Sequence, residues 1–370
     1  MVRPLLPLFL LLCSAAAALA EPLYFPAQPP ESPGLYDAPP VARPPCAGRL
    51  ISPREVHLVL PSAGVNAETG LLLNLLGIST IVDCNPQPVA LGDWADSKNL
   101  VIATISYRNL AHAFPADFGK LSIGDVLRGA GRVLEEHPQI DRRRLYLYGG
   151  SGGGHLALQV YQAAPHLWAE VHIHAAITRI TVATDLEDGY LTRWNNNLRF
   201  PESQGDLSGE QWMRFQAERT LRGPQFHARK AARVGAHHPP VWMFHGDADP
   251  LVSYQHFLDY KEALAAFSGQ PLEEVSPVQH ALENWNFVRI AGGDHSYSGA
   301  APDESSRVSA SQKYVPDCFT RLRPEDPSPA VYYRSPPHHG YRFAVEGTDL
   351  TDTIVYTELP PFTGTGWGVY

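Results

Sequence analysis

One serine, Ser151, stands among five glycines in the stretch 149–154. The apolar residues 145–148 before it predict a buried strand, and residues 156–164 after it predict a helix with a buried face. A sharp strand-to-helix turn made of small residues exposes the serine hydroxyl, as in a nucleophile elbow. The N-terminus of the following helix would also face any negative charge that forms beside the serine. The pattern favours Ser151 as the nucleophile of an acyl transfer.

A serine hydroxyl becomes reactive at neutral pH only with a histidine base and a carboxylate that orients it, here expected in the chain order Ser, Asp, His. Asp249 follows the apolar run 241–245, at the end of an expected parallel strand, where functional groups collect. His295 follows the next apolar run, 285–290, and is therefore the expected base. Asp247 is an alternative acid, but Asp-Pro-Leu-Val from Asp249 onward better matches a turn that leads into a helix.

The negative charge of the tetrahedral intermediate needs backbone donors near the nucleophile. The N–H of Gly152, directly after the nucleophile, is the first expected donor. The second is expected after the first core strand, residues 56–60, at Ala63 or Gly64. A donor of this kind contributes roughly 3 kcal/mol in the transition state.

Apolar runs and helical patterns alternate from Val56 onward, which indicates a parallel sheet covered on both faces. Strands are expected at 100–107 and 171–177, and helices at 123–136 and 254–267. The sequence thus predicts an α/β-hydrolase fold over residues 53–322, with a mostly parallel central sheet. Residues 179–225 form an expected inserted cap, and residues 323–370 an expected β-like C-terminal extension.

Three segments resemble the catalytic domain of the prolyl oligopeptidase family and its α/β-hydrolase esterase relatives: the elbow with its extra glycine, Asp125-Val126-Leu127 and residues 240–249. The resemblance extends over roughly residues 56–322. It implies that Ser151, Asp249 and His295 are nucleophile, acid and base.

Two departures from the family pattern favour an esterase over a peptidase. The residues before Val56 are too few for the β-propeller that peptidases of the family usually carry, and residues 61–64 replace its frequent His-Gly-Gly segment. The expected activity is therefore hydrolysis of carboxylic esters, in small molecules or polymers, through an acyl-enzyme. A serine peptidase or amidase is the alternative. A non-catalytic binding protein with the same fold is a third hypothesis, against which the intact Ser, Asp and His set argues.

The N-terminus has the features of an export signal. A short basic start precedes the apolar residues 5–12, and Ala18-Leu19-Ala20 has the small-x-small form of a signal-peptidase site. Residues 1–20 are therefore predicted to be a signal peptide of a secreted or periplasmic protein, and residues 21–52 a proline-rich segment. The apolar span is too short for a membrane helix.

Composition limits the partners. The formal charge of −9 argues against nucleic acid or an anionic membrane, both of which attract concentrated Lys and Arg. Cys46, Cys84 and Cys318 allow one disulfide of unassigned pairing after the signal is removed. His172 and His174 share one face of a strand, where histidines more often pack than bind metal. No cofactor or metal is expected, and the sequence leaves the oligomeric state open.

Overall fold

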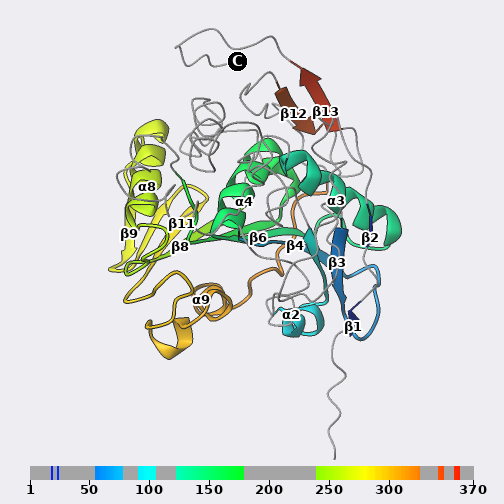
Figure 1. Cartoon of the computed structure of the whole chain (residues 1–370), viewed down its shortest axis with the longest axis horizontal. Helices are drawn as coiled ribbons and strands as arrows, with labels where there is room; N and C mark the ends of the chain where they lie inside the picture. Colours follow the sequence, from blue (N-terminus) through cyan, green and yellow to red (C-terminus); the bar gives the residue numbers. More distant parts are fainter. Residues whose placement is uncertain are drawn as a thin grey trace, which may run out of the picture.

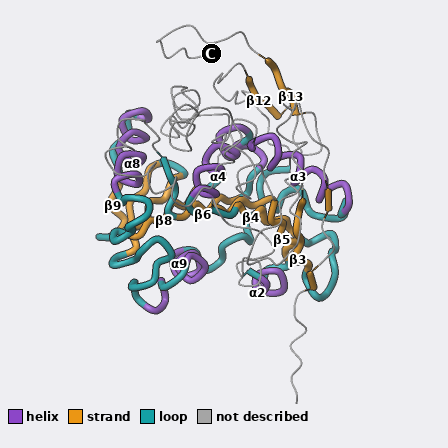
Figure 2. The backbone as a smooth tube through the Cα atoms, in the orientation of Figure 1, coloured by secondary structure: helices purple, strands orange, loops and turns teal. Residues whose placement is uncertain are grey.

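A computed structural model describes residues 18–19, 23–24, 55–77, 91–105, 122–178, 239–325, 341–345 and 354–358. A central sheet crosses the molecule (Figure 1), and helices cover both of its faces. Helices α3, α4 and α8 lie on one face, and α2 and α9 lie on the other (Figure 2). The helices are α2 Gly92–Ser97, α3 Ser122–Glu136, α4 Gly152–Ala163, α8 Gln255–Ser268 and α9 Arg307–Tyr314, with short 3-10 helices at Pro165–Leu167 and Pro302–Glu304.

The strands of the central sheet follow the order β1-β3-β5-β4-β6-β7-β8-β11-β10-β9, and β2 pairs with β3. Their bounds are β1 Ala18–Leu19, β2 Leu23–Tyr24, β3 Glu55–Leu60, β4 Gly70–Leu75, β5 Leu100–Ile105, β6 Leu145–Gly150, β7 Glu170–His174, β8 Val241–Gly246, β9 Glu273–Ser276, β10 Gln279–Leu282 and β11 Trp285–Ile290. A separate antiparallel pair consists of β12 Tyr341–Val345 and β13 Ile354–Glu358.

The central strands β5, β4, β6, β7, β8 and β11 are parallel to one another, so their carboxyl ends share one edge of the sheet. β3 is antiparallel to β5, and its carboxyl end therefore lies at the opposite edge. β10 and β9 continue the sheet beyond β11 in antiparallel pairings. The predicted α/β fold with a mostly parallel sheet and helices on both faces is confirmed.

The central strands are buried from end to end because both faces of the sheet are covered. All residues of β4, β5, β6 and β7 are buried, which explains their nearly continuous apolar sequence. One core packs Leu73 and Leu147 of the sheet against apolar side chains of α3 and α4. The other contains Trp94 of α2, whose ring lies 5.2 Å from that of Phe319.

Several predicted boundaries agree with the structure to within a few residues. The predicted helix 123–136 is α3, and the predicted strand 285–290 is β11. The strand expected at 171–177 ends earlier, at His174. The expected cap at 179–225 lies outside the described residues. Among the described helices, none combines the length and apolarity needed to cross a membrane.

Candidate active site

Ser151 occupies the turn between β6 and α4 and has the backbone angles φ 59° and ψ −126°. A positive φ is strained for a residue other than glycine, and such strain gathers at functional sites. Two backbone hydrogen bonds hold the turn: Ser151 N donates to His174 O at 2.8 Å, and His155 N donates to Ser151 O at 3.0 Å. The turn is possible only with small neighbours, because a Cβ at Gly153 would overlap with the carbonyl oxygen of Leu75.

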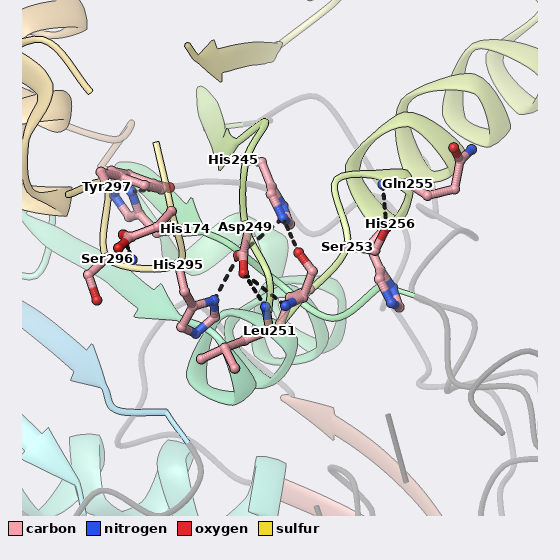
Figure 3. Close-up of polar contacts among 12 residues, drawn as sticks. His174, His245, Asp249, Leu251, Ser253, Gln255, His256, His295, Ser296 and Tyr297 are labelled. Carbon is pink, nitrogen blue, oxygen red and sulfur yellow. Dashed lines mark hydrogen bonds and ion pairs between the residues drawn. The ribbon is translucent and has the colours of Figure 1, made fainter. Parts of the chain in front are cut away.

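Asp249 lies in the turn after β8 and faces His295, in the loop after β11 (Figure 3). The Nδ1 atom of His295 lies 2.7 Å from Oδ2 of Asp249. Oδ1 accepts the backbone N–H groups of Leu251 and Val252, at 2.8 and 2.9 Å. The two carboxylate oxygens therefore have separate tasks: one is fixed by the backbone, and the other is directed at the imidazole.

Asp249 is held in its ionised form although its side chain is fully buried. Burial by itself would raise its pKa, but hydrogen bonds from His245 and His295, the charge of His295 and the N–H of Val252 outweigh it and lower the pKa below its ordinary range. The Nε2 atom of His245 lies 3.5 Å from Oδ2 of Asp249. A buried carboxylate with these partners can fix the tautomer of His295 and stabilise its charged form.

Asp247, the alternative acid, is committed elsewhere. Its Oδ1 accepts the N–H of Gly292 at 2.7 Å, and its Oδ2 lies 3.4 Å from Nη1 of Arg289. The structure thus brings Asp249, and not Asp247, to His295.

Ser151 and His295 lie at the same edge of the sheet, at the carboxyl ends of β6 and β11. One guanidinium contacts both of their loops: Nη2 of Arg307 donates to the carbonyl of His295 at 2.9 Å, and the same group lies directly against Gly150. The three residues expected from the sequence therefore lie in loops that leave the same edge of the sheet, after β6, β8 and β11.

Ala63 and Gly64 do not lie with this group, and their assignment to the oxyanion hole is corrected. They follow β3, which is antiparallel to β5, so they lie at the edge opposite to Ser151. There Gly64 N closes a turn on Pro61 O at 2.9 Å.

The segment after β4 takes the place that sequence reasoning gave to the segment after β3. β4 is parallel to β6 and adjacent to it, so Gly77 emerges beside Ser151. A Cβ at Gly77 would lie 3.2 Å from Cβ and 3.5 Å from Oγ of Ser151. The sequence feature that could have indicated this strand and the loop after it is the leucine-rich run 70–76, which is followed by Gly77. On the other side of Ser151, no side chain caps the N-terminus of α4, which begins at Gly152.

Neither a metal site nor a disulfide joins this edge in the described part of the chain. No group of three or more His, Cys, Asp or Glu side chains converges there as a possible metal site. Cys318 is a buried free thiol, and burial raises its pKa to about 11. Cys46 and Cys84 lie outside the described residues.

A comparison with protein families matches residues 106–276 to the prolyl oligopeptidase family, a span that includes Ser151 and Asp249. This match confirms the resemblance seen in the sequence. A comparison with curated proteins finds no match.

Solved structures with similarity to the chain include peptidases and an esterase. The Pyrococcus horikoshii acylaminoacyl peptidase is 14% identical, with a TM-score of 0.44, and the match covers 74% of this chain and 40% of the peptidase. Porphyromonas gingivalis dipeptidyl peptidase 4 is 16% identical, with a TM-score of 0.46 and coverage of 72% and 33%. The Thermogutta terrifontis esterase Est2 is 14% identical, with a TM-score of 0.46 and coverage of 73% and 89%. The chain spans two fifths or less of these two peptidases.

Proposed function

We propose that this chain is a serine hydrolase related to the prolyl oligopeptidase family and that it cleaves carboxylic esters, with Ser151 as nucleophile, His295 as base and Asp249 as the orienting acid. The observation that carries the proposal is the 2.7 Å contact between His295 Nδ1 and Asp249 Oδ2 at the sheet edge that also presents Ser151. That contact places the proton of the imidazole on Nδ1 and leaves Nε2 free to accept the serine proton.

The reaction proceeds in two acyl-transfer steps. Ser151 Oγ attacks the ester carbonyl while His295 takes its proton, and His295 then gives that proton to the departing alkoxide. Water then attacks the acyl-enzyme while His295 takes its proton, and His295 returns that proton to Ser151 Oγ as the acid is released. The oxyanion is stabilised by the N–H of Gly152 and, in place of Ala63 and Gly64, by the N–H of Gly77.

The side chains beside the triad support a neutral ester over a peptide with a charged end. The acidic residues that precede Asp249 and His295 are engaged within the chain: Asp247 by Gly292 and Arg289, and Asp294 by two backbone N–H groups. Leu251, next to the acid, is 53% exposed and offers an apolar surface. The name of the matched family favours the alternative, a serine peptidase or amidase.

A matched pair of substrates separates these activities. Aryl esters and anilides that share one acyl group, with acyl chains from acetyl to octanoyl and including aminoacyl groups, are compared by kcat/KM. The proposal expects turnover of esters with apolar acyl groups, and loss of that turnover in Ser151→Ala. Preferential cleavage of aminoacyl anilides would replace the proposal by the peptidase alternative.

A further inference from the structure

The two histidines of β7 belong to a buried row of polar side chains on the face of the sheet that α9 covers. Glu170, His172 and His174 alternate along the strand, so their side chains share one face, and all three are fully buried. Ser311 of α9 lies between the two imidazoles, 2.9 Å from His172 Nδ1 and 3.0 Å from His174 Nε2. The row ends at Tyr297, whose hydroxyl lies 3.2 Å from His174 Nδ1.

The carboxylate at one end of the row fixes the direction of its hydrogen bond with His172. Oε1 of Glu170 lies 2.8 Å from His172 Nε2 and accepts the N–H of Phe319, and Oε2 pairs with Arg321 at 3.3 Å. A carboxylate only accepts, so His172 Nε2 donates to it, and the Nδ1 atom of a neutral His172 accepts from Ser311.

The remaining bonds follow the same direction. The Ser311 oxygen accepts from His174 Nε2, and His174 Nδ1 accepts the hydroxyl proton of Tyr297. Burial, followed by electrostatic interactions with His172 and Arg307, lowers the pKa of His174 well below its usual value, and burial raises that of Tyr297 well above its own. Both groups are therefore neutral, as this arrangement requires.

The row reaches the loop of the catalytic histidine, because Tyr297 is two residues after His295 (Figure 3). The backbone of Tyr297 has a positive φ of 71°. A non-glycine residue holds such a conformation only when its surroundings enforce it, and the fully buried ring with its hydroxyl contact does so.

A second residue of α9 holds the other end of that short segment. Arg307 is four residues before Ser311, so both side chains leave the same face of the helix. Its guanidinium donates to the carbonyl of His295 at 2.9 Å and lies against Gly150, where any Cβ would overlap with it. α9 therefore contacts the carbonyl of His295 directly, and it reaches the hydroxyl of Tyr297 through Ser311 and His174.

We propose that α9 positions the catalytic base: Arg307 directly, and Ser311 through His174 and Tyr297, fix the segment 295–297 so that the His295 imidazole faces both Asp249 and the nucleophile. This inference rests on the proposed function. Arg307, Ser311 and Tyr297 are positioning residues in it, because their contacts join them to His295 or to its loop.

The test compares kcat and KM for one aryl ester in Arg307→Ala, Tyr297→Phe and Ser311→Ala, with the thermal midpoint measured for each. A displacement of a catalytic group by about 1 Å lowers the rate by on the order of 10²-fold, which is the expected loss of kcat in Arg307→Ala. Tyr297→Phe and Ser311→Ala lose less, on the order of 10-fold, because the contact of Arg307 remains. KM stays unchanged, because the lost interaction serves the transition state alone.

The matched control is Ser306→Ala. Ser306 caps α9 and accepts the N–H of Ser309 at 3.0 Å, but it makes no contact with the row or with His295. Its loss weakens the helix by about 1 kcal/mol. The control should therefore lower the thermal midpoint and leave kcat near wild type.

Two further measurements separate positioning from general stability. Guanidinium ion at concentrations that leave the wild type folded should restore part of kcat in Arg307→Ala and change nothing in Tyr297→Phe. The double variant Tyr297→Phe with Ser311→Ala should lose no more than the worse single variant, because both break one chain of hydrogen bonds. If Arg307→Ala does not fold, Arg307→Lys and Tyr297→Phe carry the comparison.

The inference is overturned if all these variants keep the kcat of Ser306→Ala, or if their loss of kcat follows the thermal midpoint alone. Ser151→Ala distinguishes this failure from failure of the proposed function. If Ser151→Ala is inactive while Arg307→Ala and Tyr297→Phe are fully active, only the positioning role is wrong. If Ser151→Ala retains wild-type turnover, the proposed function itself is wrong.

Discussion

Replacing Asp249 by Asn tests how the carboxylate controls the tautomer of His295. The amide has nearly the same shape but one oxygen, and it can lie in two ways. With its oxygen at the present Oδ1 position it keeps the N–H groups of Leu251 and Val252, at 2.8 and 2.9 Å, and presents its NH₂ group to His295. His295 Nδ1 must then accept, so its proton moves to Nε2, which can no longer take a proton from Ser151.

The flipped amide would restore the working tautomer at a calculable cost. Its NH₂ group would face the two backbone N–H groups, leaving the buried N–H of Val252 and the part-buried N–H of Leu251 unpaired at about 1–3 kcal/mol each, or about 2–6 kcal/mol together. At 1.36 kcal/mol per factor of ten, the productive form is disfavoured by roughly 30-fold to 10⁴-fold. We expect Asp249→Asn to lose kcat within that range.

The assay is steady-state hydrolysis of an activated aryl ester, with circular dichroism to verify folding. Asp247→Asn is the matched control, since Asp247 bonds to Gly292 and Arg289 and should tolerate the change with a few-fold effect at most. The reasoning is refuted if Asp249→Asn retains more than a tenth of wild-type kcat, or if Asp247→Asn suffers the larger loss.

Three further outcomes follow from packing and burial. Gly153→Ala should abolish soluble folded protein or activity, since its methyl group overlaps with the Leu75 carbonyl, whereas Gly92→Ala, with open space around it, should behave as wild type in the same assays. His174 has a folded-state pKa below its unfolded value near 6.5, so the unfolded chain binds more protons than the folded chain at acidic pH. Stability therefore falls as the pH drops below about 6.5, by up to about 1.4 kcal/mol per pH unit. Thermal midpoints from pH 7.5 to 5.5 should decline less steeply in His174→Gln than in the wild type, and equal declines would contradict this. Burial that raises the pKa of Cys318 to about 11 should leave this thiol unmodified by iodoacetamide at pH 8 until denaturant is added, as peptide mapping would show; rapid native labelling would contradict it.

The sequence predicted those parts of the molecule that local pattern determines. A glycine-enclosed serine between an apolar run and a helical period indicated the elbow at Ser151, and the ends of two later apolar runs indicated Asp249 and His295. These residues share an edge because parallel strands bring their carboxyl ends together. Their positions could therefore be inferred once the sheet was predicted to be parallel.

The errors concern strand direction and long-range pairing. The leucine-rich residues 70–75 were not recognised as a strand, since a short leucine run is as typical of a buried helix. Because β4 was not predicted, the loop after β3 was assigned to the place beside Ser151 that the loop after β4 occupies. No local feature of residues 55–60 shows that this strand runs antiparallel to its neighbour. Ala63 and Gly64 were misplaced for that reason.

The contacts of α9 with the loop of His295 could not be predicted from the sequence either. α9 is short and polar, with no apolar period that would predict a helix. Ser311 lies 137 residues after His174 in the chain, and Arg307 meets Gly150 only in the folded sheet. The sequence showed that His172 and His174 share a face, but their partners come from a distant segment.

Covalent labelling of Ser151 is the most direct measurement of the central claim. The protein is incubated with a fluorophosphonate, its intact mass is measured, and the adduct is mapped by peptide sequencing. The account predicts one adduct on Ser151 in the wild type, none in Ser151→Ala, and slowed labelling in His295→Ala. Equal labelling of the wild type and Ser151→Ala, or an adduct mapped to another serine, would contradict it.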